Sequence, residues 1–311
     1  MKVKNGIAVF SIVCIVVCFY SCSAKKDQVG MLLASPVFIQ DYDFVSSKLK
    51  ENGISVVSAN ANNDDRLQIA QADQMIKDGV KVIIIIPVNT NTAASIVRVC
   101  NQNKVKVIAY ERIISNCNLD YFISFDNVLI GELIAQKALK LKPQGKYMIL
   151  NGDKSDRNAV WVGEGFMNAL IAPVKSGQIQ IVYSSYIEDW SNDVAKFEFN
   201  RYIKLSNDIP DVILSAWNGM NDGIFTVLDE YKPVIYPIVG GQDADNEKCR
   251  EARNKKQRIS LFKSYKVEAT AAAELTTMLL NNKKVETNKS IFNGQVEVPS
   301  IVLSQMGIEE F

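Results

Sequence analysis

Short apolar runs alternate along this chain with stretches in which apolar residues recur every three or four positions. Apolar runs bounded by glycine, proline or polar residues indicate strands, whereas the wider spacing indicates amphipathic helices. The run 80–86 is apolar at nearly every position, so helices should cover both faces of that strand. The alternation therefore predicts an α/β protein with parallel sheets.

The predicted elements form two series, and the second series begins after Asp126. The predicted strands are 29–34, 54–59, 80–86, 106–110, 121–125, 146–151, 179–187, 211–217, 235–240 and 258–262, and residues 296–303 should be extended. Helices are predicted at 42–52, 64–79, 91–103 and 128–141, and around 161–170. No low-complexity linker separates the two series. This organisation favours two lobes that are connected by several short crossovers.

Composition narrows the class of function. The chain has 311 residues, and its 35 Lys+Arg balance 34 Asp+Glu, so it lacks the basic surplus that nucleic acid requires. It contains no histidine, which excludes Ser-His-Asp and Cys-His nucleophiles and the commonest transition-metal ligand. No G-x-G-x-x-G follows the first strand, and no P-loop is present. These features favour a binding protein over an enzyme, and we expect neither a metal nor a cofactor.

The amino terminus resembles a bacterial export signal. Lys2 and Lys4 precede the apolar run 7–20, which is too short for a comfortable membrane span. Ser21-Cys22-Ser23 follows and resembles the cleavage and lipidation box of bacterial lipoproteins. We therefore expect a signal peptide at 1–21, lipidation of Cys22 and a tether at 22–27. The alternatives are an ordinary signal peptide and a short uncleaved anchor. The lipidation reading predicts an exported protein, lipid-anchored at the bacterial cell envelope and facing the periplasm or the surface.

Only three cysteines belong to the expected mature domain, namely Cys100, Cys117 and Cys249. An odd number at wide spacing indicates neither a disulfide framework nor a metal site. The sequence leaves one disulfide among the three open.

The charged pair Glu111-Arg112 ends a buried strand, and the next strand ends in Asp126-Asn127. Unpaired charges at such a position would cost several kcal/mol, so a partner or a ligand should compensate them. In an open α/β sheet, ligands bind at the carboxyl ends of the strands. We therefore expect Glu111 and Arg112 to hold a small polar molecule.

Several blocks occur in an order that is specific to one family. They are Ser58-Ala59-Asn60, Val82 to Pro87, Ala109 to Arg112, Ile123 to Asn127, Gly131-Glu132, Asp189-Trp190, Gly241 to Asp245, and Phe262-Lys263. On these blocks the chain resembles the type I periplasmic sugar-binding proteins of the ribose/xylose-binding class. Within that class it is most similar to the D-xylose-binding proteins of ABC importers.

The resemblance implies an α/β fold of two Rossmann-like parallel-sheet lobes that are joined by three hinge crossovers. Residues 28–123 plus about 264–291 would form the N-terminal lobe, and residues 124–263 plus about 292–311 would form the C-terminal lobe. The protein would act as a monomer, enclose a monosaccharide between the lobes and deliver it to an ABC permease. It would catalyse no reaction.

The resemblance also implies a set of site residues. Glu111 and Arg112 match the acid-arginine pair of the family, and Asp156 and Asn158 match binding positions in the second lobe. Trp190 matches a stacking aromatic ring. The remaining matches are a carboxylate and a lysine, supplied by Asp243 and Lys263. Asp126 and Asn127 would serve as hinge and helix-capping residues.

Three positions depart from the family pattern. Glu111 stands where aspartate is usual, and Trp217 stands where asparagine contacts the sugar, with Asn218 next to it. The loop 35–43 is shorter than in the family and leaves Phe38 as a ring contact. Because binding sites discriminate between hydroxyl patterns, these departures leave the sugar open.

Three other classes of function compete with transport. A sensory version of the same fold would signal to a membrane histidine kinase or a chemoreceptor. The ligand core of a LacI-type repressor shares the fold, but an export segment stands where its DNA-binding domain should be. An enzyme would need a carboxylate pair to act without histidine, a metal or a nucleotide.

Overall fold

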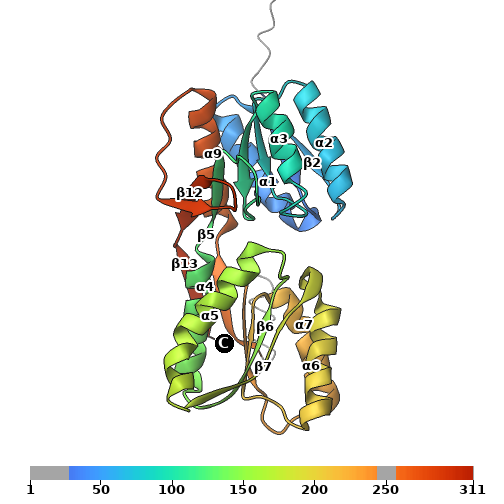
Figure 1. Cartoon of the computed structure of the whole chain (residues 1–311), viewed down its shortest axis with the longest axis vertical. Coiled ribbons are helices and arrows are strands. Elements are labelled where there is room, and N and C mark those ends of the chain that lie inside the picture. The colour runs from blue at the N-terminus through green and yellow to red at the C-terminus, as the bar shows by residue number, and fades with distance from the viewer. Residues whose placement is uncertain (1–27, 244–256, 311) are drawn as a thin grey trace, which may run out of the picture.

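A computed structural model describes residues 28–243 and 257–310 of the chain. The predicted signal peptide, the tether with Cys22, and Cys249 lie outside the described residues. The part that is described forms two α/β lobes, which lie one above the other in Figure 1.

Within the described ranges, the first lobe contains a seven-stranded sheet in the order β11-β12-β5-β4-β3-β1-β2. Its strands are β1 (Gln28–Leu33), β2 (Ser55–Asn60), β3 (Val82–Ile85), β4 (Lys106–Tyr110), β5 (Tyr121–Phe125), β11 (Lys289–Phe292) and β12 (Glu297–Leu303). Its helices are η1 (Pro36–Phe38, a 3-10 turn), α1 (Ile39–Glu51), α2 (Asp65–Lys77), α3 (Ala94–Gln102) and α9 (Tyr265–Leu280). Neighbouring strands are parallel except for β11 and β12, which pair antiparallel.

The second lobe, over the same described ranges, contains a six-stranded sheet in the order β13-β10-β9-β8-β6-β7. Its strands are β6 (Gly145–Asn151), β7 (Ile179–Tyr186), β8 (Val212–Ser215), β9 (Ile238–Gln242), β10 (Gln257–Lys263) and β13 (Met306–Glu310). Its helices are α4 (Asn127–Leu141), α5 (Arg157–Lys175), η2 (Glu188–Trp190, a 3-10 turn), α6 (Asn192–Ser206) and α7 (Asn218–Tyr231). β13 runs antiparallel to β10, and the other pairs are parallel.

The described chain passes between the two sheets at three places: after β5 at Asp126, after β10 at Ser264, and between β12 and β13. This arrangement confirms the predicted fold class. The tail differs from the expectation that residues from about 292 onward belong to the C-terminal lobe. β12 pairs with β5 in the first sheet, with Ser300 opposite Phe122, and only β13 joins the second sheet. An apolar tail pattern predicts a strand but not which of two sheets the strand will join.

The continuous apolar run in the first lobe is explained by burial on both faces of its sheet. Ile83 and Ile85 face the core cluster that contains residues of α2 and α3. Val82 and Ile84 point to the opposite cluster, which contains residues of α1 and α9. Because successive side chains of a strand point to opposite faces, every residue of β3 is buried.

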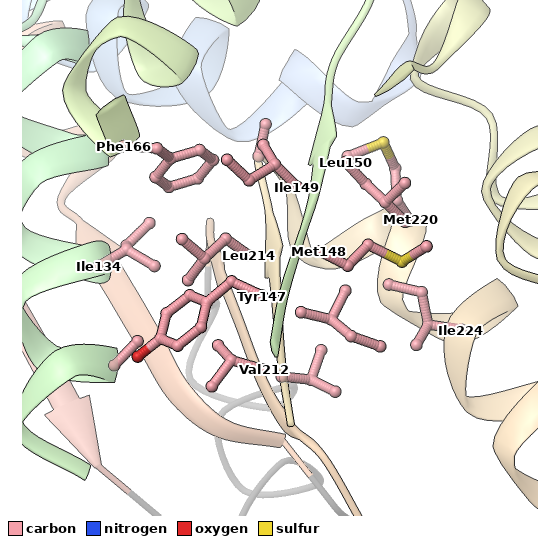
Figure 2. Packing of buried hydrophobic residues seen from close by; sticks show 14 of the residues in the cluster. Ile134, Tyr147, Met148, Ile149, Leu150, Phe166, Val212, Leu214, Met220 and Ile224 are labelled. Atoms are coloured by element: carbon pink, nitrogen blue, oxygen red, sulfur yellow. The ribbon is translucent and has the colours of Figure 1, made fainter. Parts of the chain in front are cut away.

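The core of the second lobe is built around β6 in the same way. Tyr147 and Ile149 lie on the side of Phe166 from α5, whereas Met148 lies on the side of Ile224 from α7 (Figure 2). The buried Tyr147 hydroxyl donates to the main-chain oxygen of Lys142 at 2.6 Å, so its polar atom is satisfied.

Helices α4 and α5 approach each other at two glycines. A Cβ atom on Gly131 would lie 2.1 Å from the main-chain oxygen of Val162, and one on Gly165 would lie 2.0 Å from that of Val128. No side chain fits at either position, so the two backbones are in direct contact. This contact fixes α4, which follows the first crossover, against α5, which carries Asn158 and is capped by Asp156.

Candidate functional site

Most of the predicted ligand-binding residues meet where the carboxyl ends of strands from both sheets face each other. Glu111 follows β4 with a φ of 64°, and Asp243 follows β9 with a φ of 65°. Residues other than glycine rarely adopt this left-handed conformation, and such strain is concentrated at functional sites. The backbone therefore turns sharply at two of the positions that the sequence singled out.

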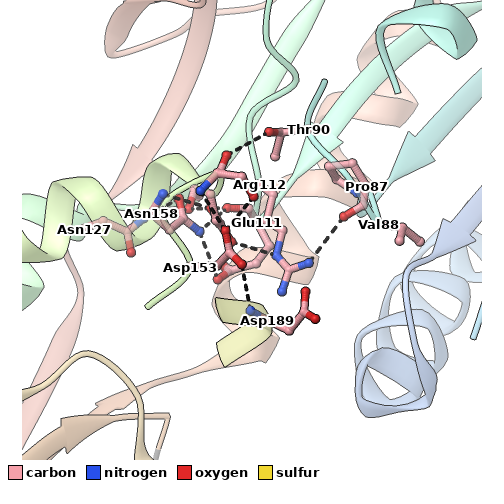
Figure 3. A network of polar contacts seen from close by, with 12 residues as sticks. Pro87, Val88, Thr90, Glu111, Arg112, Asn127, Asp153, Asn158 and Asp189 are labelled. Carbon is pink, nitrogen blue, oxygen red and sulfur yellow. Dashed lines mark hydrogen bonds and ion pairs between the residues drawn. The ribbon is translucent and has the colours of Figure 1, made fainter. Parts of the chain in front are cut away.

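Glu111 forms hydrogen bonds and an ion pair with groups from both lobes. The side-chain amide of Asn158 donates to the main-chain oxygen of Glu111 at 2.9 Å and to its Oε1 at 3.5 Å (Figure 3). Ser124 Oγ donates to the same main-chain oxygen at 3.0 Å. Lys263 Nζ lies 3.3 Å from Glu111 Oε1. Because Asn158 and Lys263 belong to the second lobe, their contacts with Glu111 cross between the lobes, whereas the Ser124 bond stays within the first lobe.

Arg112 is the second bridge between the lobes. Its Nε lies 3.2 Å from Oδ2 of Asp156, and its guanidinium donates to the main-chain oxygen of Pro87 at 3.4 Å. The guanidinium carbon also lies 5.8 Å from the ring centre of Phe38. Asp156 has a double role, since its Oδ1 accepts from the main-chain N–H of Asn158 at 2.9 Å and caps α5. Thr90 Oγ1 adds a third bridge by donating to the main-chain oxygen of Ser155 at 3.2 Å.

Lys263 lies between two carboxylates. Its Nζ is 3.0 Å from Asp243 Oδ1 as well as 3.3 Å from Glu111, and only 9% of its side chain is exposed. Burial alone would lower the pKa of Lys263, but the neighbouring carboxylates of Asp243 and Glu111 raise it above its ordinary value. Lys263 therefore stays charged in the site.

Two further acids, Glu268 and Asp41, belong to this cluster and were missed in the sequence. Burial raises the pKa of Glu268 well above its ordinary range, and the adjacent Glu111 adds to the rise. Burial raises the pKa of Asp41 to about 6. The Tyr110 hydroxyl, which donates a hydrogen bond to Asp41 at 2.7 Å, lowers that pKa but does not offset the effect of burial. The available signal for Glu268 was an acid in the stretch 267–273 of α9, which is apolar apart from this residue and Thr270. It points to a buried charge but does not identify its partner.

The hydrogen bonds of Asp153 shape the loop beside this cluster. Its Oδ1 accepts from Ser155, and its Oδ2 accepts from the main-chain N–H of Asp189 at 2.7 Å (Figure 3). Burial would raise the pKa of Asp153, but the bonds from Ser155 and Asp189 bring it below its ordinary value. This ionised carboxylate joins the loop before α5 to η2, which contains Trp190.

Trp190 and Trp217 of the second lobe lie flat against glycines. A Cβ on Gly152 would be 2.2 Å from the ring of Trp190, and a Cβ on Gly219 would be 2.2 Å from the ring of Trp217. Each indole is partly buried and packs against the core of the second lobe. The buried Nε1 of Trp190 has no hydrogen-bond partner among the described residues.

Asn218 has protein partners instead. Its amide nitrogen donates to Ser260 Oγ at 2.9 Å, and its carbonyl oxygen accepts from Asn221 at 3.3 Å. The expectation that Asn218 contacts a ligand stays a prediction, and these bonds favour a supporting position.

At the first crossover, Asp126 caps α4 by accepting from the main-chain N–H of Leu129 at 3.1 Å, and its Oδ2 lies 3.6 Å from Lys289 Nζ. The buried amide of Asn127 donates to Asn158 Oδ1 at 3.1 Å. The crossover is thus connected to the site through Asn158.

Three observations bear on metals, disulfides and membranes. Cys100 and Cys117 are buried free thiols. In the two described ranges, no group of three or more Cys, Asp or Glu side chains could hold a metal ion. None of the helices described here has the length and apolar character that a membrane span requires.

Two parallel-sheet lobes, three crossovers, and charged side chains that meet between the lobes define the type I periplasmic-binding-protein fold. A family model described as a periplasmic binding protein domain matches residues 32–284, and the chain belongs to that family. The match spans both lobes and confirms the class that the sequence blocks indicated. Its members are exported binding proteins of the periplasm, which implies an exported location here as well.

Individual proteins agree with this assignment. The chain is 28% identical over 314 residues to the D-xylose-binding periplasmic protein of Haemophilus influenzae, covering 100% of this chain and 94% of that protein. A Clostridium phytofermentans ABC transporter solute-binding protein, solved with bound β-D-glucose, matches with a TM-score of 0.84 at 23% identity, covering 91% and 94%. The fructose-binding periplasmic domain of a hybrid two-component system matches with a TM-score of 0.78 at 18% identity, covering 91% and 90%. The two structural matches show the fold.

Proposed function

We propose that this protein captures a small sugar, an aldose such as D-xylose or another pentose, between its lobes and delivers it to an ABC importer. The observation that carries the proposal is the interlobe cluster of Glu111, Arg112, Asp156 and Lys263. These groups are largely buried, and they come from both lobes. The full-length similarity to a D-xylose-binding protein supports the choice of ligand class.

Each site residue has a role that sugar chemistry requires. Sugar hydroxyls both donate and accept, so the carboxylates of Glu111 and Asp243 would accept from them, and Arg112 and Lys263 would donate. Such charged hydrogen bonds contribute about 1.5–3 kcal/mol each. The ring of Trp190 would cover an apolar C–H face of the sugar, and Phe38 would close the opposite side. After the ordering costs, the total corresponds to roughly micromolar affinity.

Closure of the lobes would couple binding to delivery. Asp126 and Asn127 stand at the first crossover, where they would act as hinge residues. A sugar between the lobes would replace some of the direct bonds between Glu111 and Asn158 and between Arg112 and Asp156. The protein would act as a monomer, with lipidated Cys22 holding it near the permease. It would carry out no catalysis.

The alternative is a sensory receptor that uses the same cleft and signals to a membrane histidine kinase. Its support is the shared fold with the periplasmic domain of a two-component system. A permease and an ATPase encoded beside this protein would favour transport, whereas a neighbouring kinase would favour sensing.

A thermal-shift screen of the purified protein against pentoses, hexoses and polyols tests the proposal. A ligand at a hundredfold excess over its dissociation constant stabilises the folded state by about 2.7 kcal/mol, which is readily measured. We expect a shift with at least one aldose, followed by calorimetric titration of that sugar. If no sugar shifts the transition, the proposed function is wrong.

A further inference from the structure

Glu268 is a buried acid next to the interlobe cluster of charged residues that contains Glu111 and Lys263. It lies in the first turn of α9, immediately after the second crossover, and is only 4% exposed. Its carboxyl is within hydrogen-bonding reach of the Glu111 carboxyl. Two carboxyls in contact cannot both be ionised at low cost, so a hydrogen bond between them needs one proton.

The surrounding charges decide which acid holds that proton. Burial raises the pKa of Glu111 above its ordinary value, but Lys263 Nζ at 3.3 Å and the adjacent Arg112 oppose that rise and favour the ionised form. Glu268 is the more buried of the two, and its Oε1 accepts no hydrogen bond from any donor in the described residues. An ionised Glu268 would leave this buried oxygen unsatisfied, which costs more for a charged group than for a neutral one. The proton therefore belongs on Glu268.

The other groups around Glu268 reinforce this assignment. Asp41 approaches from α1, with the Tyr110 hydroxyl of β4 donating to it, and Asp243 faces the same lysine from the end of β9. One lysine, Lys263, thus faces four carboxyl groups when Glu111 and Glu268 are included. Full ionisation would leave a large uncompensated negative charge in a buried place.

We propose that Glu268 is a positioning residue, which stays protonated and donates its carboxyl proton to Glu111, thereby holding Glu111 ionised and aimed between the lobes. The role rests on the proposed sugar-binding function, because it matters only if Glu111 accepts from the ligand. The residue touches the ligand only through Glu111. As pH rises until Glu268 loses its proton, repulsion between the two carboxylates should displace Glu111 and weaken binding.

Infrared spectroscopy of the full-length protein without sugar tests the proton directly. The wild type at pH 7 should show the C=O stretch of a protonated carboxylic acid, and Glu268→Gln should remove it. Asp41→Asn serves as the matched control, because it identifies any part of the band that comes from Asp41, whose pKa is also raised. A band that is unchanged in Glu268→Gln overturns the proposal, whatever the protein binds.

Calorimetric titration with D-xylose between pH 5 and 10 tests the positioning role. Glu268→Gln keeps a donor toward Glu111, so it should retain affinity within about threefold at pH 7 and lose the decline at high pH. Glu268→Met has a similar size but no donor and should bind at least tenfold more weakly at pH 7. Equal affinity and an equal pH profile for wild type and both variants would refute the role. Where Glu268→Met fails to fold, the pH profile of Glu268→Gln alone decides.

The two tests separate the two proposals. If Glu268→Gln removes the infrared band while neither D-xylose nor any other sugar binds the wild type, the proton assignment stands. The proposed function, and with it the positioning role, is then overturned.

Discussion

Arg112 in the first lobe forms an ion pair with Asp156 in the second, with Nε 3.2 Å from Oδ2. The same carboxylate caps α5, so its position is fixed by the helix independently of Arg112. Rigid support of this kind favours a defined binding geometry, because a side chain with a fixed partner loses little freedom when a ligand binds.

Arg112→Ala should weaken sugar binding at least tenfold while the protein stays folded. The substitution removes a guanidinium from the cleft and leaves Asp156 without its ion-pair partner. Calorimetry with the best sugar of the screen measures the loss. Arg66→Ala, on an exposed face of α2, is the matched control and should bind normally. Equal affinity for wild type and Arg112→Ala would show that the site is elsewhere.

Lys263→Met should destabilise the protein by about 3–5 kcal/mol at neutral pH, since it leaves the carboxylates of Glu111 and Asp243 without their cation. The loss should shrink at acid pH, where protonation neutralises those carboxylates. Urea unfolding at two pH values measures both effects. The exposed Lys284→Met serves as the control. A pH-independent loss would contradict the electrostatic explanation.

Asp41→Asn should flatten the dependence of stability on pH. The pKa of Asp41 rises from its ordinary value of 3.8 to about 6 on folding. Its contribution to stability is therefore fully present below about pH 4 and is lost as pH rises through 6, a change of about 3 kcal/mol. Unfolding of wild type and variant from pH 4 to 8 compares the slopes. Parallel curves would show that Asp41 titrates normally.

Gly165→Ala should destabilise the protein by several kcal/mol, because the new methyl group would lie 2.0 Å from the main-chain oxygen of Val128 and force α4 and α5 apart. Gly53→Ala is an informative comparison, since that position has open space but a φ of 71°. It should cost only about 1 kcal/mol of backbone strain. Thermal unfolding of both variants gives the contrast, and similar losses would argue against direct backbone contact.

The sequence predicted most of the fold and part of the site for identifiable reasons. The apolar run 80–86 required a sheet that is covered on both faces, and Glu111-Arg112 stood at a strand end where the chain turns toward the cleft. Glu268 was missed because its role depends on how α9 docks beside β4, which no local pattern encodes. The same reason applies to the partners of Asn218 and to the sheet that β12 joins.

The position of β12 has a consequence for the order of folding. In the first sheet, β5 lies between β4 and β12, yet β12 follows the whole second lobe in the chain. Because the chain is synthesised from its amino terminus, β5 remains an unpaired edge of the first sheet until β12, which ends at Leu303, has been made. The second lobe contains most of its sheet in one continuous stretch and can assemble earlier. The lobe that is made first should therefore be completed last, and its long-range strand pairing should limit the rate of folding.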